Sequence, residues 1–361
     1  MRTRSRKLVI AAAAVLLLAF VLYRSRGMLH FGDFSGAKLL AAVRGANPLL
    51  LGLSVLTIYA CYALRAARWQ VFQKNLGPSH FWSVYGMTLA GFSALFLLGR
   101  VGEPIRPLLL ARKEKLPVSG MFGIYLLERL FDTASFAVIA SVGLLLFQSR
   151  YNVGDVTEGL RRAAKTTGFV LSLGVLVAIA FLIYLRLHGM AFLERRLRLA
   201  PAQAFRSKFL RILLELAHGA QTIRTWGQLA LAVLYSTAHW FLVLLVYLWV
   251  SHAFGGTLGS ISLADAMLVM AFTLVGSAVQ VPGVGGGSQA GSIIAYTAIF
   301  GVEREPAVAA AMVVWLISFG MCNLVGLPLL IHQGWSLGEL RQMAKQETAS
   351  ELASAPGEIA E

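Results

Sequence analysis

Three charged residues lie inside an apolar stretch that is long enough to cross a membrane. Glu128, Arg129 and Asp132 belong to the sequence YLLERLFDTASF, and Glu128 falls about 14 Å along a helix that begins near Ser119. Each charge would cost about 2.5–3.5 kcal/mol in lipid, so we expect all three to face the protein interior. Glu128 and Asp132 share a helix face, and Arg129 can pair with Asp132. The pattern is typical either of a structural ion pair or of a functional site.

A second group of charges lies in a stretch of broken backbone, LLGRVGEPIRPLLLARKEK, which begins at Leu97 directly after an apolar segment. Arg100 and Arg106 offer fork-shaped donors suited to a phosphodiester, and Glu103 can hold one arginine when the site is empty. The alternative is that these side chains only reach towards the membrane interface. The first interpretation predicts a site for a phosphate-bearing headgroup.

A third candidate site is the glycine-rich stretch VPGVGGGSQAGS, which begins at Val281 and opens a helix. Successive glycines let the backbone approach a ligand, and free N–H groups at a helix start favour an anion. In the alternative interpretation, the glycines permit close helix packing. The candidate binding residues in this stretch are Gly283, Gly285, Gly286, Gly287, Ser288 and Gln289.

The sequence predicts neither a metal nor a cofactor, and no catalytic residue. The seven histidines form no metal-binding pair, and His239 beside Trp240 is interpreted as a packed intramembrane histidine. The glycine spacing in the second break falls short of a dinucleotide-binding fingerprint.

The composition indicates an integral membrane protein. Of 361 residues, 57% are hydrophobic and only 14% are charged, which is too apolar for a soluble domain of this length. Lys and Arg number 32 against 17 acidic residues, an excess that we expect in cytoplasmic loops near anionic lipid. No helix-turn-helix, zinc-finger or RNA-binding signature accompanies the basic residues, so nucleic acid is not a predicted partner.

The elements that must position these charges are membrane spans. Apolar segments of roughly membrane length fall at 8–23, 49–64, 84–98, 118–147, 168–187, 227–252, 264–281, 286–300 and 306–331. If the two breaks turn the chain back, 84–111 and 264–300 are re-entrant hairpins and six segments cross fully. Both termini are then cytoplasmic, as is the loop that holds Arg65 and Arg68. The predicted fold is an all-α polytopic membrane protein with about six full spans and two hairpins.

Two further segments are assigned by composition. Residues 203–226 have the helical spacing of an interfacial helix on anionic lipid, although a cytoplasmic elbow fits equally well. The transmembrane domain is predicted to cover 1–335, and 336–361 to be a disordered cytoplasmic tail.

The two broken segments resemble one another. TLAGFSALFLLGRVG from Thr88 aligns with TLVGSAVQVPGVG from Thr273, with one small gap in each copy. The predicted topology brings the two hairpins in from opposite sides, as in the inverted repeats of secondary transporters. Broken backbone is tolerated inside a bilayer only where protein or a polar cavity surrounds it. We therefore expect both breaks to line one cavity near the midplane.

Together these motifs resemble the flippase-like transmembrane region of lysylphosphatidylglycerol synthetases, which also occurs as a stand-alone protein. The resemblance covers residues 8–331 and rests on LRAARW at 64–69, Gly102-Glu103 with Arg106, Glu128-Arg129 with Asp132, and VPGVGGG from Val281. It implies a bacterial inner-membrane protein that moves a lipid or lipid-linked headgroup between leaflets. It also implies that the aminoacyl-transferring domain of the fused proteins is absent, so that the protein is not an enzyme.

The second half departs from the family pattern. Gln289 stands where an acidic residue is common, and Trp315 where an arginine is common. These changes remove the charge pair expected in the second repeat and favour an anionic or neutral cargo over a lysine-bearing one.

The function predicted from the sequence is translocation of a phosphate-bearing phospholipid or polyprenyl-phosphate-linked lipid. A membrane enzyme or accessory subunit acting on a lipid-linked sugar is the alternative, a scaffold without cargo is a third possibility, and the oligomeric state is left open.

Replacing Arg129 should destabilise the fold by leaving a carboxylate unpaired, whereas replacing Arg106 should spare folding and remove activity.

Overall fold

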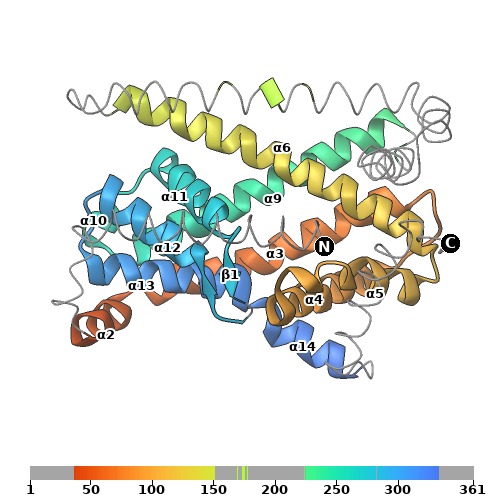
Figure 1. Ribbon diagram of the computed structural model, residues 1–361, viewed down its shortest axis with the longest axis horizontal. Helices are drawn as coiled ribbons and strands as arrows, with labels where there is room; N and C mark the ends of the chain where they lie inside the picture. Colours follow the sequence, from red (N-terminus) through yellow and green to blue (C-terminus); the bar gives the residue numbers. More distant parts are fainter. Residues whose placement is uncertain are drawn as a thin grey trace, which may run out of the picture.

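The residues that the structure describes are helical apart from one small β-hairpin, as the computed structural model in Figure 1 shows. The structure describes residues 36–150, 225–281 and 283–332, with isolated positions between 169 and 223. The longer helices are α3 (Pro48–Gln73), α4 (Phe81–Leu98), α5 (Ile105–Glu114), α6 (Val118–Arg150), α9 (Trp226–Ala253), α11 (Leu263–Gly276), α12 (Gly287–Ile294), α13 (Arg304–Trp315) and α14 (Cys322–His332). The shorter elements are α2 (Gly36–Gly45), the 3₁₀ turn η3 (Gly99–Gly102), α10 (Gly256–Gly259), strands β1 (Gln280–Val281) and β2 (Gly285–Gly286), and the π-helical turns η4 (Ala295–Ile299) and η5 (Leu316–Gly320).

Helices α3 and α9 form an antiparallel pair at the centre of the protein. Asn47 begins α3, and its Oδ1 accepts a hydrogen bond from the backbone N–H of Leu49 at 2.9 Å. The Asn47 N–H donates to the carbonyl of Ala253 at the far end of α9, at 2.7 Å. At the opposite end, Asn75 Nδ2 lies 3.3 Å from Gln228 Oε1. Polar groups therefore join the two helices at both ends.

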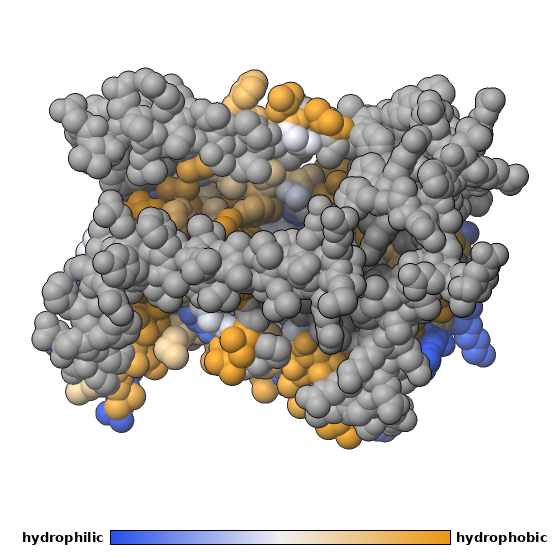
Figure 2. Space-filling model, in the orientation of Figure 1, coloured by the Kyte–Doolittle hydropathy of each residue, from blue (hydrophilic) through white to orange (hydrophobic). Residues whose placement is uncertain are grey.

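Four helical segments of the described residues are long and apolar enough to cross a membrane. They are Pro48–Gln73, Phe81–Leu98, Trp226–Ala253 and Arg304–His332. Large hydrophobic side chains project outward from them: Leu49 and Leu56 on α3 are 77% and 70% exposed. Figure 2 shows hydrophobic side chains across much of the described surface. Such a surface fits contact with lipid rather than with water.

The all-α membrane prediction is confirmed, and the number of spans and the re-entrant placement of the hairpins stay predictions. The predicted spans at 49–64, 227–252 and 306–331 fall within helices that the structure describes. The predictions for 8–23 and 336–361 lie outside the described residues, and those for 168–187 and 203–226 lie largely outside them.

Each sequence break separates two helices that pack against each other. Helix α4 ends at Leu98, as predicted, and Gly99 follows with a φ of 64° before α5 folds back onto α4. In the second segment α12 likewise contacts α11. This second break begins at Ser277, earlier than the Gly/Pro stretch suggested, because strands β1 and β2 pair there as a hairpin.

The two broken segments meet each other directly. The N–H of Gly283, in the turn of the β-hairpin, donates to the carbonyl of Phe96 in α4 at 2.8 Å. The Phe96 ring also lies 5.7 Å from the ring of Trp315 at the end of α13. Segments nearly 190 residues apart thus close around a common space.

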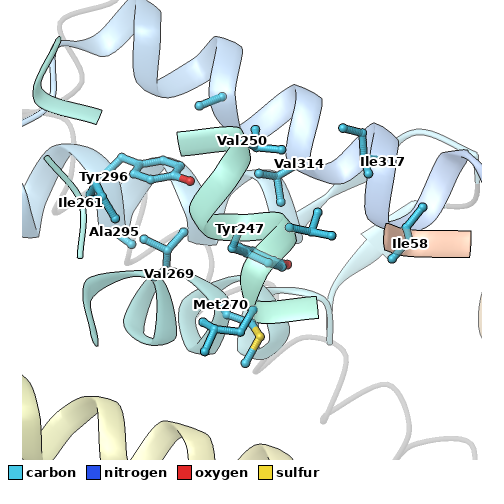
Figure 3. Close-up of a cluster of buried hydrophobic side chains, with 14 of the residues drawn as sticks. Ile58, Tyr247, Val250, Ile261, Val269, Met270, Ala295, Tyr296, Val314 and Ile317 are labelled. Atoms are coloured by element: carbon cyan, nitrogen blue, oxygen red, sulfur yellow. The ribbon is translucent and has the colours of Figure 1, made fainter. Parts of the chain in front are cut away.

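Two hydrophobic cores hold these elements together. The larger one surrounds Tyr247 of α9 and Tyr296 of η4 and includes Val269 and Met270 of α11 (Figure 3). The buried hydroxyl of Tyr296 lies 2.8 Å from Ser251 Oγ, which satisfies both groups. The second core surrounds Trp69 and joins α3, α4, α5 and α6.

The close contact of α11 with α12 depends on Gly291. A Cβ atom there would collide with the backbone carbonyl of Phe272, whereas Gly52 on α3 has open space. We expect Gly291→Ala to lower the stability by about 1–3 kcal/mol through overpacking, and Gly52→Ala to leave it unchanged or raise it. Thermal unfolding of both variants in detergent tests this. Equal melting temperatures would show that α11 and α12 do not pack as described.

The membrane topology can be tested at two exposed residues, Lys113 in α5 and Thr257 in α10. These helices lie towards opposite ends of the long axis in Figure 1. In a protein whose buried Cys61 and Cys322 are replaced by alanine, cysteines at positions 113 and 257 should react with impermeant reagents on opposite sides of the membrane. Labelling of both from one side would refute the inverted arrangement of the hairpins.

Candidate functional site

A buried cluster of charges joins α3, α5 and α6. The carboxylate of Glu128 is fully buried and binds three arginines: Arg65 at 2.9 Å, Arg68 at 2.8 Å and, through its other oxygen, Arg106. Asp132 binds Arg65 at 2.9 Å and Arg68 at 2.8 Å. Each carboxylate is therefore held by at least two guanidinium groups.

Helical spacing on two helices creates this cluster. Arg65 and Arg68 are three residues apart on α3, and Glu128 and Asp132 are four apart on α6, so each pair lies on one helix face. Arg68 also donates from Nη1 to Ser236 Oγ of α9 at 2.8 Å. Helix α9 thus contacts the cluster through Arg68, while α3 and α5 supply the arginines that bind the two carboxylates of α6.

Arg106 reaches the cluster because Gly91 leaves room for it. A Cβ atom at Gly91 would collide with the Arg106 side chain where α5 folds back on α4. The Arg106 guanidinium lies 4.7 Å from the ring centre of Trp69 and 5.0 Å from that of Phe92. Aromatic faces stabilise a desolvated cation at such distances.

The observed pairing corrects three predictions. Arg129 does not pair with Asp132: it makes no ion pair within the described residues, and its guanidinium lies 5.1 Å from the Tyr125 ring centre. Arg106, expected to be free for a ligand, is buried against Glu128. Arg65 and Arg68 lie inside α3 and not in a cytoplasmic loop, because the helix continues to Gln73 and the arginines find carboxylates on α6.

A cavity of about 790 Å³ lies between the charge cluster and the second break. The charged lining residues are Arg65, Arg129, Asp132 and Glu103, and the second break contributes Gly283 and Gly285. Aromatic side chains complete the lining, namely Tyr62, Phe92, Phe96, Phe136, Trp240, Tyr247, Trp315 and Phe319. Both breaks therefore line one cavity, which combines a charged wall with aromatic ones.

The predicted site residues divide into three groups around this cavity. Those at the cavity wall are Glu103, Arg129, Asp132, Gly283 and Gly285. Arg106 and Glu128 stand behind it in the cluster, and the Arg100 side chain lies outside the described part of the structure. Glu103 accepts a hydrogen bond from the hydroxyl of Tyr125 at 2.5 Å, where an arginine partner was expected.

The remaining predicted residues, Gly286 to Gln289, stabilise the β-hairpin. The Gln289 amide accepts from the N–H of Gly286 and donates to the carbonyl of Val284 at 3.1 Å. The N–H of Gly287 donates to the carbonyl of Val279 at 2.9 Å. Two of the N–H groups predicted to bind an anion thus already have protein acceptors.

Gln289 and Trp315 lie side by side at Gly285. A Cβ atom on Gly285, whose φ is 91°, would collide with the Gln289 amide and approach the Trp315 indole nitrogen to 2.6 Å. The two positions at which the sequence lacks the expected charge pair are therefore neighbours, and both side chains are uncharged.

Sequence reasoning missed several cavity residues. His239 was interpreted as a packing residue, yet it lines the cavity together with Trp240. Ser318 and Phe319 come from the π-helical turn η5, an irregularity that often marks functional sites. The motif LRAARW contained the signal for Arg65 and Arg68, but only the fold supplies their partners.

The fold and site define a class of helical membrane protein in which two helix–break–helix segments and a buried charge cluster enclose a cavity. The chain matches the lysylphosphatidylglycerol synthase TM region family over residues 7–326, and it belongs to this family of multi-pass membrane proteins. It is 24% identical over 323 residues to a UPF0104 membrane protein of Methanothermobacter thermautotrophicus, covering 82% of this chain and 89% of that relative. No solved structure matches it.

The charge cluster predicts that substituting Arg68 lowers the stability far more than substituting Arg129. Arg68→Gln should lower the stability by about 3–5 kcal/mol, because it removes one partner from buried carboxylates. Arg129→Gln should cost no more than about 1 kcal/mol, since the lost contact is with the Tyr125 ring. Thermal unfolding of the purified variants measures both. If Arg129→Gln is the more damaging change, the assigned pairing is wrong.

Proposed function

We propose that this protein translocates a phosphate-bearing lipid or lipid-linked headgroup between the leaflets of a membrane. The observation that carries the proposal is the cavity that both breaks line, with its charged wall on α3 and α6. A headgroup crossing a bilayer needs a polar path through the apolar layer, because unpaired polar groups are costly in hydrocarbon. The cavity supplies such a surface, and membership of the family supports this reading.

The balance of charge favours an anionic group. Four arginines face three carboxylates in and around the cluster: Arg65, Arg68, Arg106 and Arg129 against Glu103, Glu128 and Asp132. One positive charge is in excess, and Arg129 is the arginine at the cavity wall that has no ion pair among the described residues. A phosphodiester oxygen pair fits the donor fork of a guanidinium.

The aromatic walls fit the other part of such a cargo. The rings of Phe96 and Trp315 are in tilted contact where the two breaks meet, and Phe136 lines the same cavity from α6. Apolar rings can contact the glycerol backbone or the first carbons of a lipid chain while the phosphate lies near Arg129. We propose a membrane phospholipid or a polyprenyl-phosphate-linked lipid as cargo.

The uncharged side chains of Gln289 and Trp315 beside Gly285 disfavour a cationic headgroup. A lysyl ester would bring a positive charge beside Arg65 and Arg129, and among the described residues the second break contributes no carboxylate to the cavity.

We propose that the protein lies in the bacterial inner membrane with both termini in the cytoplasm, so that its basic loops face anionic lipid.

Reconstituted liposomes test the proposal. We expect the protein to move labelled phosphatidylglycerol or a polyprenyl phosphate faster than lysyl-phosphatidylglycerol. Arg129→Gln should slow movement about tenfold or more, because hydrogen bonds to a charged group contribute about 1.5–3 kcal/mol. Lys113→Gln, which removes a positive charge at an exposed position outside the cavity, should leave the rate unchanged.

Two outcomes contradict this reading. Faster movement of the lysyl ester overturns the argument from charge. Movement of none of the three lipids removes the translocation proposal and favours a role as an enzyme or accessory subunit that acts on a lipid-linked sugar.

A further inference from the structure

Two neighbouring side chains of α9 bring unpartnered polar atoms to the cavity. His239 and Trp240 are only 4% and 7% exposed, and both line the cavity. Within the described part of the chain, neither ring nitrogen of His239 nor the indole N–H of Trp240 has a hydrogen-bond partner. Buried polar groups are nearly always bonded, so a set of orphans on one cavity wall points to a ligand.

The two side chains adjoin the charged wall. The His239 backbone carbonyl lies 3.8 Å from the Cys61 sulfur, one helical turn from Arg65 on α3. Its ring lies 5.5 Å from that of Trp240, nearly edge-on at 72°. The Nε of Arg129 is a further orphan donor at the same cavity. Unpartnered polar atoms of the cavity are therefore found at Arg129, where the phosphate is proposed to bind, and also at His239 and Trp240 on α9.

Resting on the proposed function, we infer that His239 and Trp240 recognise hydroxyl groups on a polyol or sugar attached to the phosphate of the cargo. A neutral imidazole has one donor and one acceptor, which a hydroxyl can match at once because it both donates and accepts. The Trp240 indole offers a donor only, so it needs the lone pair of a hydroxyl or phosphate oxygen. An ammonium group beyond the phosphate has no acceptor and would leave the Trp240 indole unsatisfied.

His239 and Trp240 would then determine the preference for a headgroup that carries hydroxyls. A headgroup of the same size without hydroxyls would fill the space but leave the imidazole and indole unpaired. Sites built to bond a hydroxyl discriminate strongly against the analogue that lacks it, whereas shape alone discriminates weakly. The shared chemistry is a phosphate ester with adjacent hydroxyls, which a glycerol-headgroup phospholipid and a polyprenyl phosphosugar both supply.

Binding to the full-length protein in nanodiscs tests the inference without requiring transport. Short-chain phosphatidylglycerol is compared with phosphatidylpropanol, which lacks the headgroup hydroxyls, and a polyprenyl phosphosugar with the bare polyprenyl phosphate. We expect the wild type to prefer the hydroxyl-bearing member of at least one pair by about tenfold or more. The pair that shows the preference identifies the source of the hydroxyls.

Matched substitutions locate the preference. His239→Phe and Trp240→Phe should reduce the ratio towards one while phosphate-dependent binding remains, and His239→Gln, which keeps a donor and an acceptor, should retain part of it. Two exposed residues outside the cavity provide controls: His80→Phe and Trp82→Phe should keep the full ratio.

Each outcome decides the inference. Equal binding within both lipid pairs by the wild type, or an unchanged ratio in both α9 variants, overturns it. If the hydroxyl preference depends on His239 and Trp240 but the protein moves no lipid, the binding site is supported. Only the proposed translocation is then contradicted.

Discussion

The burial of Glu128 is the constraint on which the rest of the structure depends. A carboxylate without solvent exposure in a membrane protein is tolerated only if charged partners surround it, and here three guanidinium groups do so. Those arginines come from α3 and α5, so neither helix can shift along α6 without leaving charge unpaired. The ion pairs thereby fix the register of helices whose apolar surfaces would otherwise slide past one another.

The first sequence break follows from the same requirement. Arg106 can contact Glu128 only if α5 returns alongside α4, and a return needs a turn at Gly99 and close helix contact at Gly91. The charges and the broken backbone in this stretch are thus two parts of one arrangement. The same arrangement also forms part of the cavity wall, because residues of α4 and of the first break line the cavity.

The sequence allowed the helices and the charged residues to be predicted, but not which charges meet. Apolar length located α3 and α9, and glycine located the first break. The same charge rule that assigns basic residues to loops misplaced Arg65 and Arg68, because a helix extends past its apolar run when carboxylates on another helix are available. Spacing alone favoured Arg129 as the partner of Asp132. It could not show that Arg65 and Arg68 on α3 bind this carboxylate instead. The role of Gln289 in the β-hairpin was equally hidden, since it depends on backbone groups at Gly286 and Val284.

The two broken segments share a helix–break–helix plan and are held by different interactions. Ion pairs among buried groups fix the first broken segment to α3 and α6, and losing one partner costs several kcal/mol. The second is packed into the larger hydrophobic core through α11, and it meets the first through a backbone hydrogen bond from Gly283 to Phe96. A hydrogen bond contributes only about 0.5–1.5 kcal/mol. Any motion that opens the cavity should therefore move the β1–β2 hairpin and α12 away from α4 while the charged wall stays in place, so that a bound headgroup keeps its partners as access to it changes.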